Sequence, residues 1–73
     1  MDREQFGRRF KAARTAAGLT QGAMADQLGI SRPRIAEYEA GRRIPTVTRL
    51  YEMIDALGLD YAIFFPEANR RHR

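Results

Sequence analysis

Residues 20–41, TQGAMADQLGISRPRIAEYEAG, contain two short helical patterns separated by a single glycine. Thr20 is a residue type that caps helices, and the first pattern would run from Gln21 to Leu28 with Met24 and Leu28 buried. Gly29 would end this helix, because glycine readily takes the left-handed conformation that follows a helix.

The second pattern begins after Ser31, which is again an N-cap residue type. Pro33 falls in its first turn, where a missing N–H has no helical partner to lose. The predicted buried positions and the helix stop then follow at helical spacing: Ile35, Tyr38 and Gly41. Two helices joined through a glycine predict a helix-turn-helix over residues 21–40, with a generic αα-hairpin as the alternative.

A further helix is predicted on each side of this pair. Asp2 and Gln5 have the spacing of a capping box, and Gly18 would end the helix that they begin. Thr46 would cap a fourth helix that continues to about Leu57. Apolar residues recur at helical spacing in both helices and predict their buried faces: Phe6, Phe10, Ala13 and Ala17 in the first, and Val47, Leu50, Ile54 and Leu57 in the fourth.

Length and composition limit the function classes. The chain has 73 residues, no cysteine and one histidine, His72, so disulfides and thiolate metal sites are excluded and a metal cage is not expected. No apolar run approaches the roughly 20 residues of a membrane span, and the first residues lack a secretory pattern, so we expect a cytoplasmic protein. We find no nucleophile with a base, no paired carboxylates and no phosphate-cradling glycine loop, and therefore expect neither an enzyme nor a cofactor or small-molecule effector site.

Charge is unevenly distributed along the chain. The net charge is +4, and residues 31–49 carry five bases against two acids. Residues 50–69 carry four acids and no base. A molecule with one basic and one acidic end is typical of proteins that dock on a polyanion, although an arginine-rich solubilising surface is the alternative.

A set of residues within and on either side of the two central helices recurs at specific spacings. The set comprises Arg14, Gly18, Leu19, Thr20, Gln21, Ala25, Gly29, Ile35 and the run Tyr38-Glu39-Ala40-Gly41-Arg42-Arg43-Ile44-Pro45. From Phe6 to Phe65, the sequence that carries this set resembles the lambda-repressor-like helix-turn-helix family, which includes the Cro and xenobiotic-response-element regulators. The resemblance implies an all-α bundle of four to five helices and a function in binding double-stranded DNA.

The resemblance also implies a role for individual residues. The third helix would enter the major groove and present its outward side chains to base edges: Arg32, Pro33, Ala36 and Glu37. Phosphate contacts would come from the start of the second helix, the third helix and the loop after it: Gln21, Ser31, Arg34, Arg42 and Arg43. Arg14 and Glu39 match the family's buried ion pair, which holds the fold and does not touch DNA.

Three of these roles have alternatives. Arg32 could contact a phosphate without reading a base, and Arg34 could read a base instead of contacting a phosphate. Glu37 could orient a neighbouring arginine instead of accepting a hydrogen bond from a cytosine. Arg42 and Arg43 could be solvated loop residues.

Residues 59–65 are expected to form the dimerisation segment. Family members commonly place a short fifth helix here, but Tyr, Ile and Phe are better strand formers than helix formers. We therefore predict a short strand, with a helix as the alternative. One face of the strand would pair with its copy in a second subunit: Leu59, Tyr61, Ile63 and Phe65. A terminal strand of this kind is similar to that of the DNA-binding antitoxins of persistence-kinase modules.

The sequence thus predicts one DNA-binding domain over residues 1–66, followed by a basic disordered tail over residues 67–73. The predicted function is a sequence-specific transcriptional regulator, a repressor that binds a near-palindromic operator as a homodimer. The alternative is an antitoxin that neutralises a partner toxin and regulates its own operon.

Overall fold

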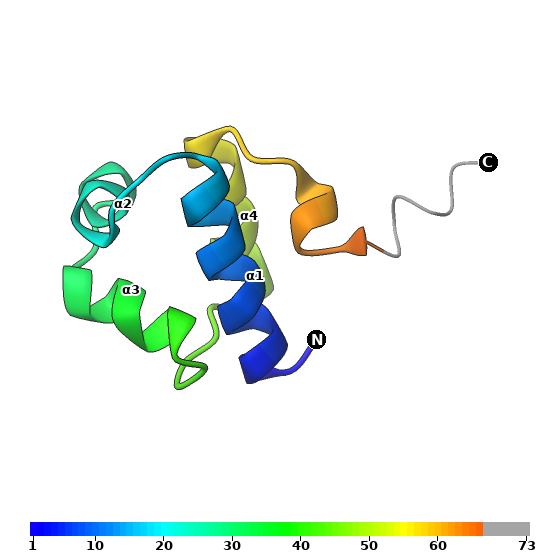
Figure 1. The fold of residues 1–73 in the computed structure, drawn as a ribbon. Helices are drawn as coiled ribbons and strands as arrows, with labels where there is room; N and C mark the ends of the chain where they lie inside the picture. Colours follow the sequence, from blue (N-terminus) through cyan, green and yellow to red (C-terminus); the bar gives the residue numbers. More distant parts are fainter. Residues whose placement is uncertain (67–73) are drawn as a thin grey trace.

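The chain folds into four α-helices and one turn of 3-10 helix in a computed structural model that describes residues 1–66. The helices are α1 (Arg3–Ala16), α2 (Gln21–Leu28), α3 (Arg32–Glu39) and α4 (Val47–Leu57), and the 3-10 turn η1 spans Tyr61–Ile63. In Figure 1, α2 and α3 lie on one side of α1, and α4 lies behind it. The all-α fold and the helix-turn-helix over residues 21–40 are confirmed. The predicted tail, residues 67–73, lies outside the described residues.

Side chains at the helix starts satisfy the free amides there, as the sequence predicted. Asp2 accepts from the Gln5 amide at 2.7 Å and donates its own amide to the Gln5 side chain at 3.1 Å, which completes the capping box. Three hydroxyl caps each accept from the amide three residues later: Thr20, Ser31 and Thr46. The boundaries of all four helices therefore follow from local hydrogen bonding.

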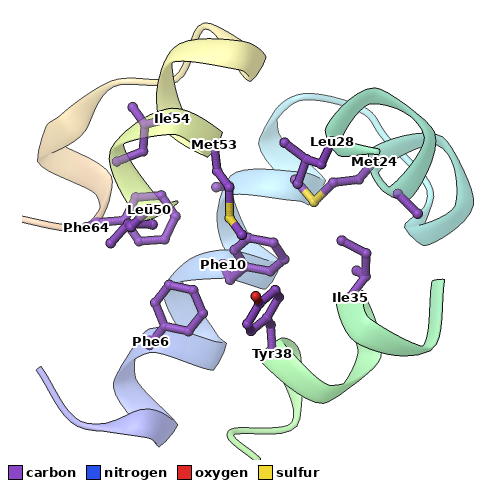
Figure 2. Close-up of a cluster of buried hydrophobic side chains, with 12 residues drawn as sticks. Phe6, Phe10, Met24, Leu28, Ile35, Tyr38, Leu50, Met53, Ile54 and Phe64 are labelled. Atoms are coloured by element: carbon purple, nitrogen blue, oxygen red, sulfur yellow. The ribbon is translucent and has the colours of Figure 1, made fainter. Parts of the chain in front are cut away.

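The core is a single cluster to which every helix contributes (Figure 2). At its centre, the Phe6 ring lies 5.4 Å from that of Phe10 and 5.7 Å from that of Tyr38. Phe64 stacks on Phe6 at 5.8 Å, so the segment after α4 closes the same cluster. Aliphatic and sulfur side chains fill the space toward α2, α3 and α4: Met24, Leu28, Ile35, Leu50, Met53 and Ile54.

The predicted buried faces of α1 and α4 are wrong at their ends. Ala17 is exposed, because α1 ends at Ala16 and Ala17 is its C-cap, while Leu19 packs against the core instead. Val47 is 63% exposed and Leu57 is half-buried, whereas Met53 is fully buried. The core-facing side of α4 is therefore rotated toward Leu50, Met53 and Ile54, which helical spacing alone allows equally well.

The predicted strand over residues 59–65 is wrong. Within residues 1–66 there is no strand, and Asp60 instead caps η1 by accepting from the Ala62 amide at 2.9 Å. Phe64, predicted to lie opposite the pairing face, is the residue that enters the core, and Arg9 fixes its carbonyl with a 2.8 Å hydrogen bond. Burial of one aromatic ring against α1 therefore outweighs the strand propensity of this segment. The likeness to antitoxins that rested on a terminal strand loses its support.

α1 and α3 approach each other unusually closely at Gly7. A Cβ atom at Gly7 would lie 2.7 Å from the Glu39 carbonyl oxygen and 2.8 Å from that of Tyr38. Real Cβ atoms essentially never come within 3.0 Å of such atoms. Gly7 thus lets the end of α3 rest directly on the backbone of α1. Among the described residues, no helix is both long and apolar enough to cross a membrane.

Candidate nucleic-acid interface

The side chains on the outer face of α3 take no part in the hydrophobic core. Arg32, Pro33 and Ala36 are exposed, whereas Ile35 and Tyr38 on the opposite face are buried. Ser31 precedes the helix, and its hydroxyl accepts from the Arg34 amide at 3.2 Å. The predicted base-reading positions are therefore presented together on a rigid, capped helix, with their side chains available to a ligand.

Glu37 is the exception on this face, because its carboxylate is already engaged. Its Oε1 accepts from Arg43 Nε at 3.0 Å and lies 3.6 Å from Arg34 Nε. All three side chains remain between 42% and 49% exposed. In this arrangement Glu37 orients two arginines, which is the alternative role that the sequence left open for it.

Two shallow depressions flank Glu37. One, of about 370 Å³, runs along the outer face of α3 and is lined by Pro33, Ala36, Glu37, Ala40 and Arg42. The other, of about 340 Å³, lies between the start of α1 and the loop after α3 and is lined by Arg3, Glu37, Arg42, Arg43 and Ile44. Arg42 and Arg43, the predicted phosphate contacts of the loop, thus border the outer face of α3.

The predicted ion pair joins the last residue of α3 to α1. Arg14 Nε donates to Glu39 Oε2 at 2.5 Å, and Arg14 Nη2 donates to Glu39 Oε1 at 3.2 Å. The two side chains are 15% and 7% exposed. The hydrogen bond to Glu39 raises the pKa of Arg14, and burial opposes this effect. Arg14 Nη1 also donates to the Leu19 carbonyl at 2.9 Å, so the guanidinium fixes the turn before α2 as well.

Gln21 belongs to the same cluster. Its Nε2 donates to Glu39 Oε1 at 3.2 Å, which places the amide of this predicted phosphate contact beside the ion pair. Because a primary amide has two N–H groups, one remains available to a ligand. Its neighbour Gly22 faces open space, since a Cβ atom there would meet only the Thr20 hydroxyl, at 4.0 Å.

Sequence reasoning missed three residues that position this surface. No sequence pattern marks Gly7 as important, because its role depends on how closely the backbone of α3 approaches α1 in the folded protein. Arg49 Nη2 donates to the Leu28 carbonyl at 3.3 Å and so ties α4 to the end of α2. Arg3 lines the depression beside the α3–α4 loop, and its place in the first turn of a helix gave no indication of this.

An apolar surface lies on α4 and η1, away from α3. Val47, Tyr51 and Tyr61 are 63%, 44% and 41% exposed. The Tyr51 ring lies 5.4 Å from Tyr61 and 5.8 Å from Phe65. Tyr61 donates its hydroxyl to Asp55 Oδ1 at 2.5 Å, and this hydrogen bond raises the pKa of Tyr61. We call Val47, Tyr51, Tyr61 and Phe65 the α4–η1 surface.

The predicted dimerisation residues are only partly on this surface. Tyr61 is exposed and Phe65 is half-buried at its edge. Leu59 and Ile63 are half-buried and pack against the core of their own chain. Among residues 1–66, no group of three or more His, Cys, Asp or Glu side chains could hold a metal ion.

Comparison with known protein families decides the classification. The sequence model described as "Helix-turn-helix domain" matches residues 5–62. The chain belongs to the helix-turn-helix domain family. The match runs from Gln5 in the first turn of α1 through α4 and into η1, so all the residues of the outer α3 face and the ion pair lie within it.

Relatives in the family are named as transcriptional regulators. The chain is 41% identical over 54 residues to the SPbeta prophage-derived uncharacterized HTH-type transcriptional regulator YonR of Bacillus subtilis, covering 74% of this chain and 50% of the relative. It is 39% identical over 59 residues to the uncharacterized HTH-type transcriptional regulator y4dJ of Sinorhizobium fredii, covering 81% and 77%. It is 41% identical over 49 residues to the cryptic phage CTXphi transcriptional repressor RstR of Vibrio cholerae, covering 67% and 44%. The chain thus spans about half the length of some of these relatives.

Solved structures of regulators share the fold. The restriction-modification controller protein C.AhdI from Aeromonas hydrophila is similar with a TM-score of 0.71 and 28% identity, over 82% of this chain and 91% of that chain. The clp gene regulator ClgR from C. glutamicum is similar with a TM-score of 0.77 and 26% identity, over 92% and 87%. Both comparisons include the helix-turn-helix and most of the domain around it.

Proposed function

We propose that this chain is a sequence-specific, double-stranded-DNA-binding transcriptional regulator that acts as a repressor. The observation that carries the proposal is the outer face of α3, where Arg32, Pro33 and Ala36 are exposed on a capped helix and take no part in the core. The major groove of B-DNA accommodates one α-helix, and each base pair presents a distinct pattern of donors and acceptors there. The names of the relatives as regulators and a repressor support the same function.

Arg32 would read a base, because it follows the cap of α3 and is exposed. Arginine forms two parallel hydrogen bonds to guanine O6 and N7, which discriminate against other bases by about 1–3 kcal/mol. Pro33 and Ala36 would contact a thymine methyl group. Glu37 would act chiefly by orienting Arg34 and Arg43, with which it already pairs.

Phosphate contacts would come from two segments near the carboxyl end of this helix. Gln21 stands at the start of α2, where the helix dipole favours an anion and the second N–H of the side-chain amide is available. Arg42 and Arg43 follow the carboxyl end of α3, the same end at which Gln21 binds Glu39. Such contacts would supply much of the affinity, and the affinity would therefore fall steeply with salt. A regulator of this kind occludes a promoter by position and needs no chemistry.

Selection of bound sites from random double-stranded DNA tests the proposal. The wild-type chain should enrich a defined sequence. Arg32→Ala should relax the preference at one base position, whereas Arg43→Ala should weaken binding to all sequences alike. Equal losses for both variants on the selected site and on random DNA would contradict the assignment of α3 as the reading helix.

The active form would be a homodimer on a near-palindromic operator. One short helix reads few bases, and helix-turn-helix proteins gain specificity by binding two half-sites about one helical turn apart. The α4–η1 surface is the candidate interface, because it exposes large apolar side chains away from α3. No observation in the described residues favours a toxin partner.

Sedimentation at micromolar concentration tests the dimer. Tyr51→Glu should dissociate it, whereas Ala56→Glu, which adds the same charge at an exposed position about 140° round the same helix, should not. A wild-type chain that sediments only as a monomer would refute this part of the proposal and leave DNA binding to be judged separately.

A further inference from the structure

The depression between α1 and the α3–α4 loop has a net positive charge that is not balanced by ion pairs within the described residues. Three arginines, Arg3, Arg42 and Arg43, line it together with a single carboxylate, Glu37. That carboxylate is shared between Arg43 and Arg34. Within residues 1–66, neither Arg3 nor Arg42 forms an ion pair. The site therefore carries an excess of guanidinium groups facing a common space of about 340 Å³.

The backbone holds Arg3 at this place firmly. Gly41 adopts a left-handed conformation with φ of 76°, and a Cβ atom there would lie 3.4 Å from the Arg3 carbonyl oxygen and 3.3 Å from the Glu4 Cα. The turn after α3 thus rests on the first turn of α1. Figure 1 shows the dark-blue start of α1 beside the green loop that follows α3. Arg3 therefore extends from a packed helix into a site formed with a distant part of the chain.

The folding of α1 does not explain an arginine at this position. Arg3 is the first residue of α1, where the positive end of the helix dipole repels a cation. Its side chain donates no hydrogen bond to the described part of the protein. A positive charge that opposes its own helix and faces two further arginines is well placed to hold an anion.

The same depression adjoins the face proposed to read DNA. Glu37 and Arg42 line both this depression and the one along the outer side of α3. A duplex that receives α3 in its major groove would therefore bring its backbone toward the three arginines. Guanidinium groups bind phosphate oxygens through paired, charge-assisted hydrogen bonds.

We propose that Arg3 completes, with Arg42 and Arg43, a pocket for one phosphate of the DNA backbone. This proposal rests on the proposed function. Arg3 adds to the predicted phosphate contacts a residue from α1, a helix to which the sequence assigned only structural roles. Glu37 is the internal counter-ion that holds Arg43 in place until the phosphate arrives.

Arg3→Gln, with Arg8→Gln as the matched control, tests the pocket. Arg8 is an exposed arginine of the same helix and lines neither of the two depressions. Binding to a duplex selected by the wild-type chain, and to a random duplex, is measured over a range of salt concentrations. Each lost phosphate contact lowers the steepness of log K against log salt by about 0.9 per protomer. Arg3→Gln should show this change on both duplexes, and Arg8→Gln should not.

Each other outcome has a defined meaning. If the wild-type chain binds DNA and Arg3→Gln retains the wild-type salt dependence, the pocket is refuted and the proposed function stands. If the wild-type chain binds no DNA, the proposed function itself fails. If inorganic phosphate alone perturbs the amide resonances of residues 41–44 while Arg3→Gln leaves the DNA salt dependence unchanged, the pocket is a small-anion site and the proposal is overturned. Thermal unfolding of both variants checks that neither substitution disrupts the fold.

Discussion

Replacing Gly7 by alanine should destabilise the protein, although alanine is normally the better residue in a helix. The new Cβ atom would lie 2.7 and 2.8 Å from two carbonyl oxygens at the end of α3, about 0.6 Å closer than ordinary contact. These atoms belong to the backbone and cannot rotate away, so α3 must move as a unit. Overpacking of this kind costs about 1–3 kcal/mol, and we expect the upper end of that range. The higher helix propensity of alanine offsets about 1 kcal/mol of this cost, so the free energy of unfolding should fall by about 2 kcal/mol.

Gly22→Ala is the matched control, because Gly22 is also helical but faces open space. It should gain about 1 kcal/mol, since only the helix propensity changes. In a domain of this size 1 kcal/mol shifts the midpoint of thermal unfolding by about 4–8 °C. Circular dichroism should therefore show Gly7→Ala melting roughly 10 °C below the wild type and Gly22→Ala melting above it. A Gly7→Ala variant as stable as the wild type would refute the close approach of α1 and α3.

Three further substitutions probe the charged and polar contacts. Glu39→Ala should lower the free energy of unfolding, measured by urea denaturation, by about 3 kcal/mol, because it leaves the largely buried Arg14 without its partner. A decrease below about 1 kcal/mol would mean that this pair contributes no more than a surface ion pair. Glu37→Gln should tighten binding to random duplex DNA about fivefold at low salt, since it removes one negative charge from the side proposed to face DNA; unchanged affinity would contradict that proposal. Tyr61→Phe should change how the free energy of unfolding depends on pH at alkaline pH. Because the hydrogen bond to Asp55 raises the pKa of Tyr61, this bond stabilises the fold below about pH 10 and is lost as the hydroxyl ionises. Unfolding midpoints measured on both sides of pH 10 should therefore fall more for the wild type than for the variant, and equal falls would count against this contact.

The parts of the fold that local chemistry controls were predictable from the sequence. A cap and its amide lie within three residues of each other, as at Asp2 and Thr20, and a left-handed glycine such as Gly58 ends a helix wherever it stands. Such signals mark the ends of both helices of the helix-turn-helix, and α2 and α3 therefore begin and end within one residue of the predicted positions.

The remaining features depend on parts of the chain that are far apart. Residues 59–65 have strand propensity, but Phe64 packs against Phe6 and Phe10, which are distant in the sequence and adjacent on the buried face of α1. Arg3 and the α3–α4 loop are brought together by the packing of Gly41 on α1, which no spacing reveals. The candidate base-reading positions could be named from the sequence, but the contacts that hold Glu37 needed the three-dimensional structure.

Arg14, Glu39 and Gln21 meet at one end of α3, whereas Arg32, Pro33 and Ala36 occupy its outer face and, within residues 1–66, share no side-chain hydrogen bond or ion pair with them. The helix thus separates the residues that hold it from those that face outward. Substitutions on that outer face can accumulate without loss of folding, so under the proposed function a single scaffold can acquire new sequence preferences one side chain at a time.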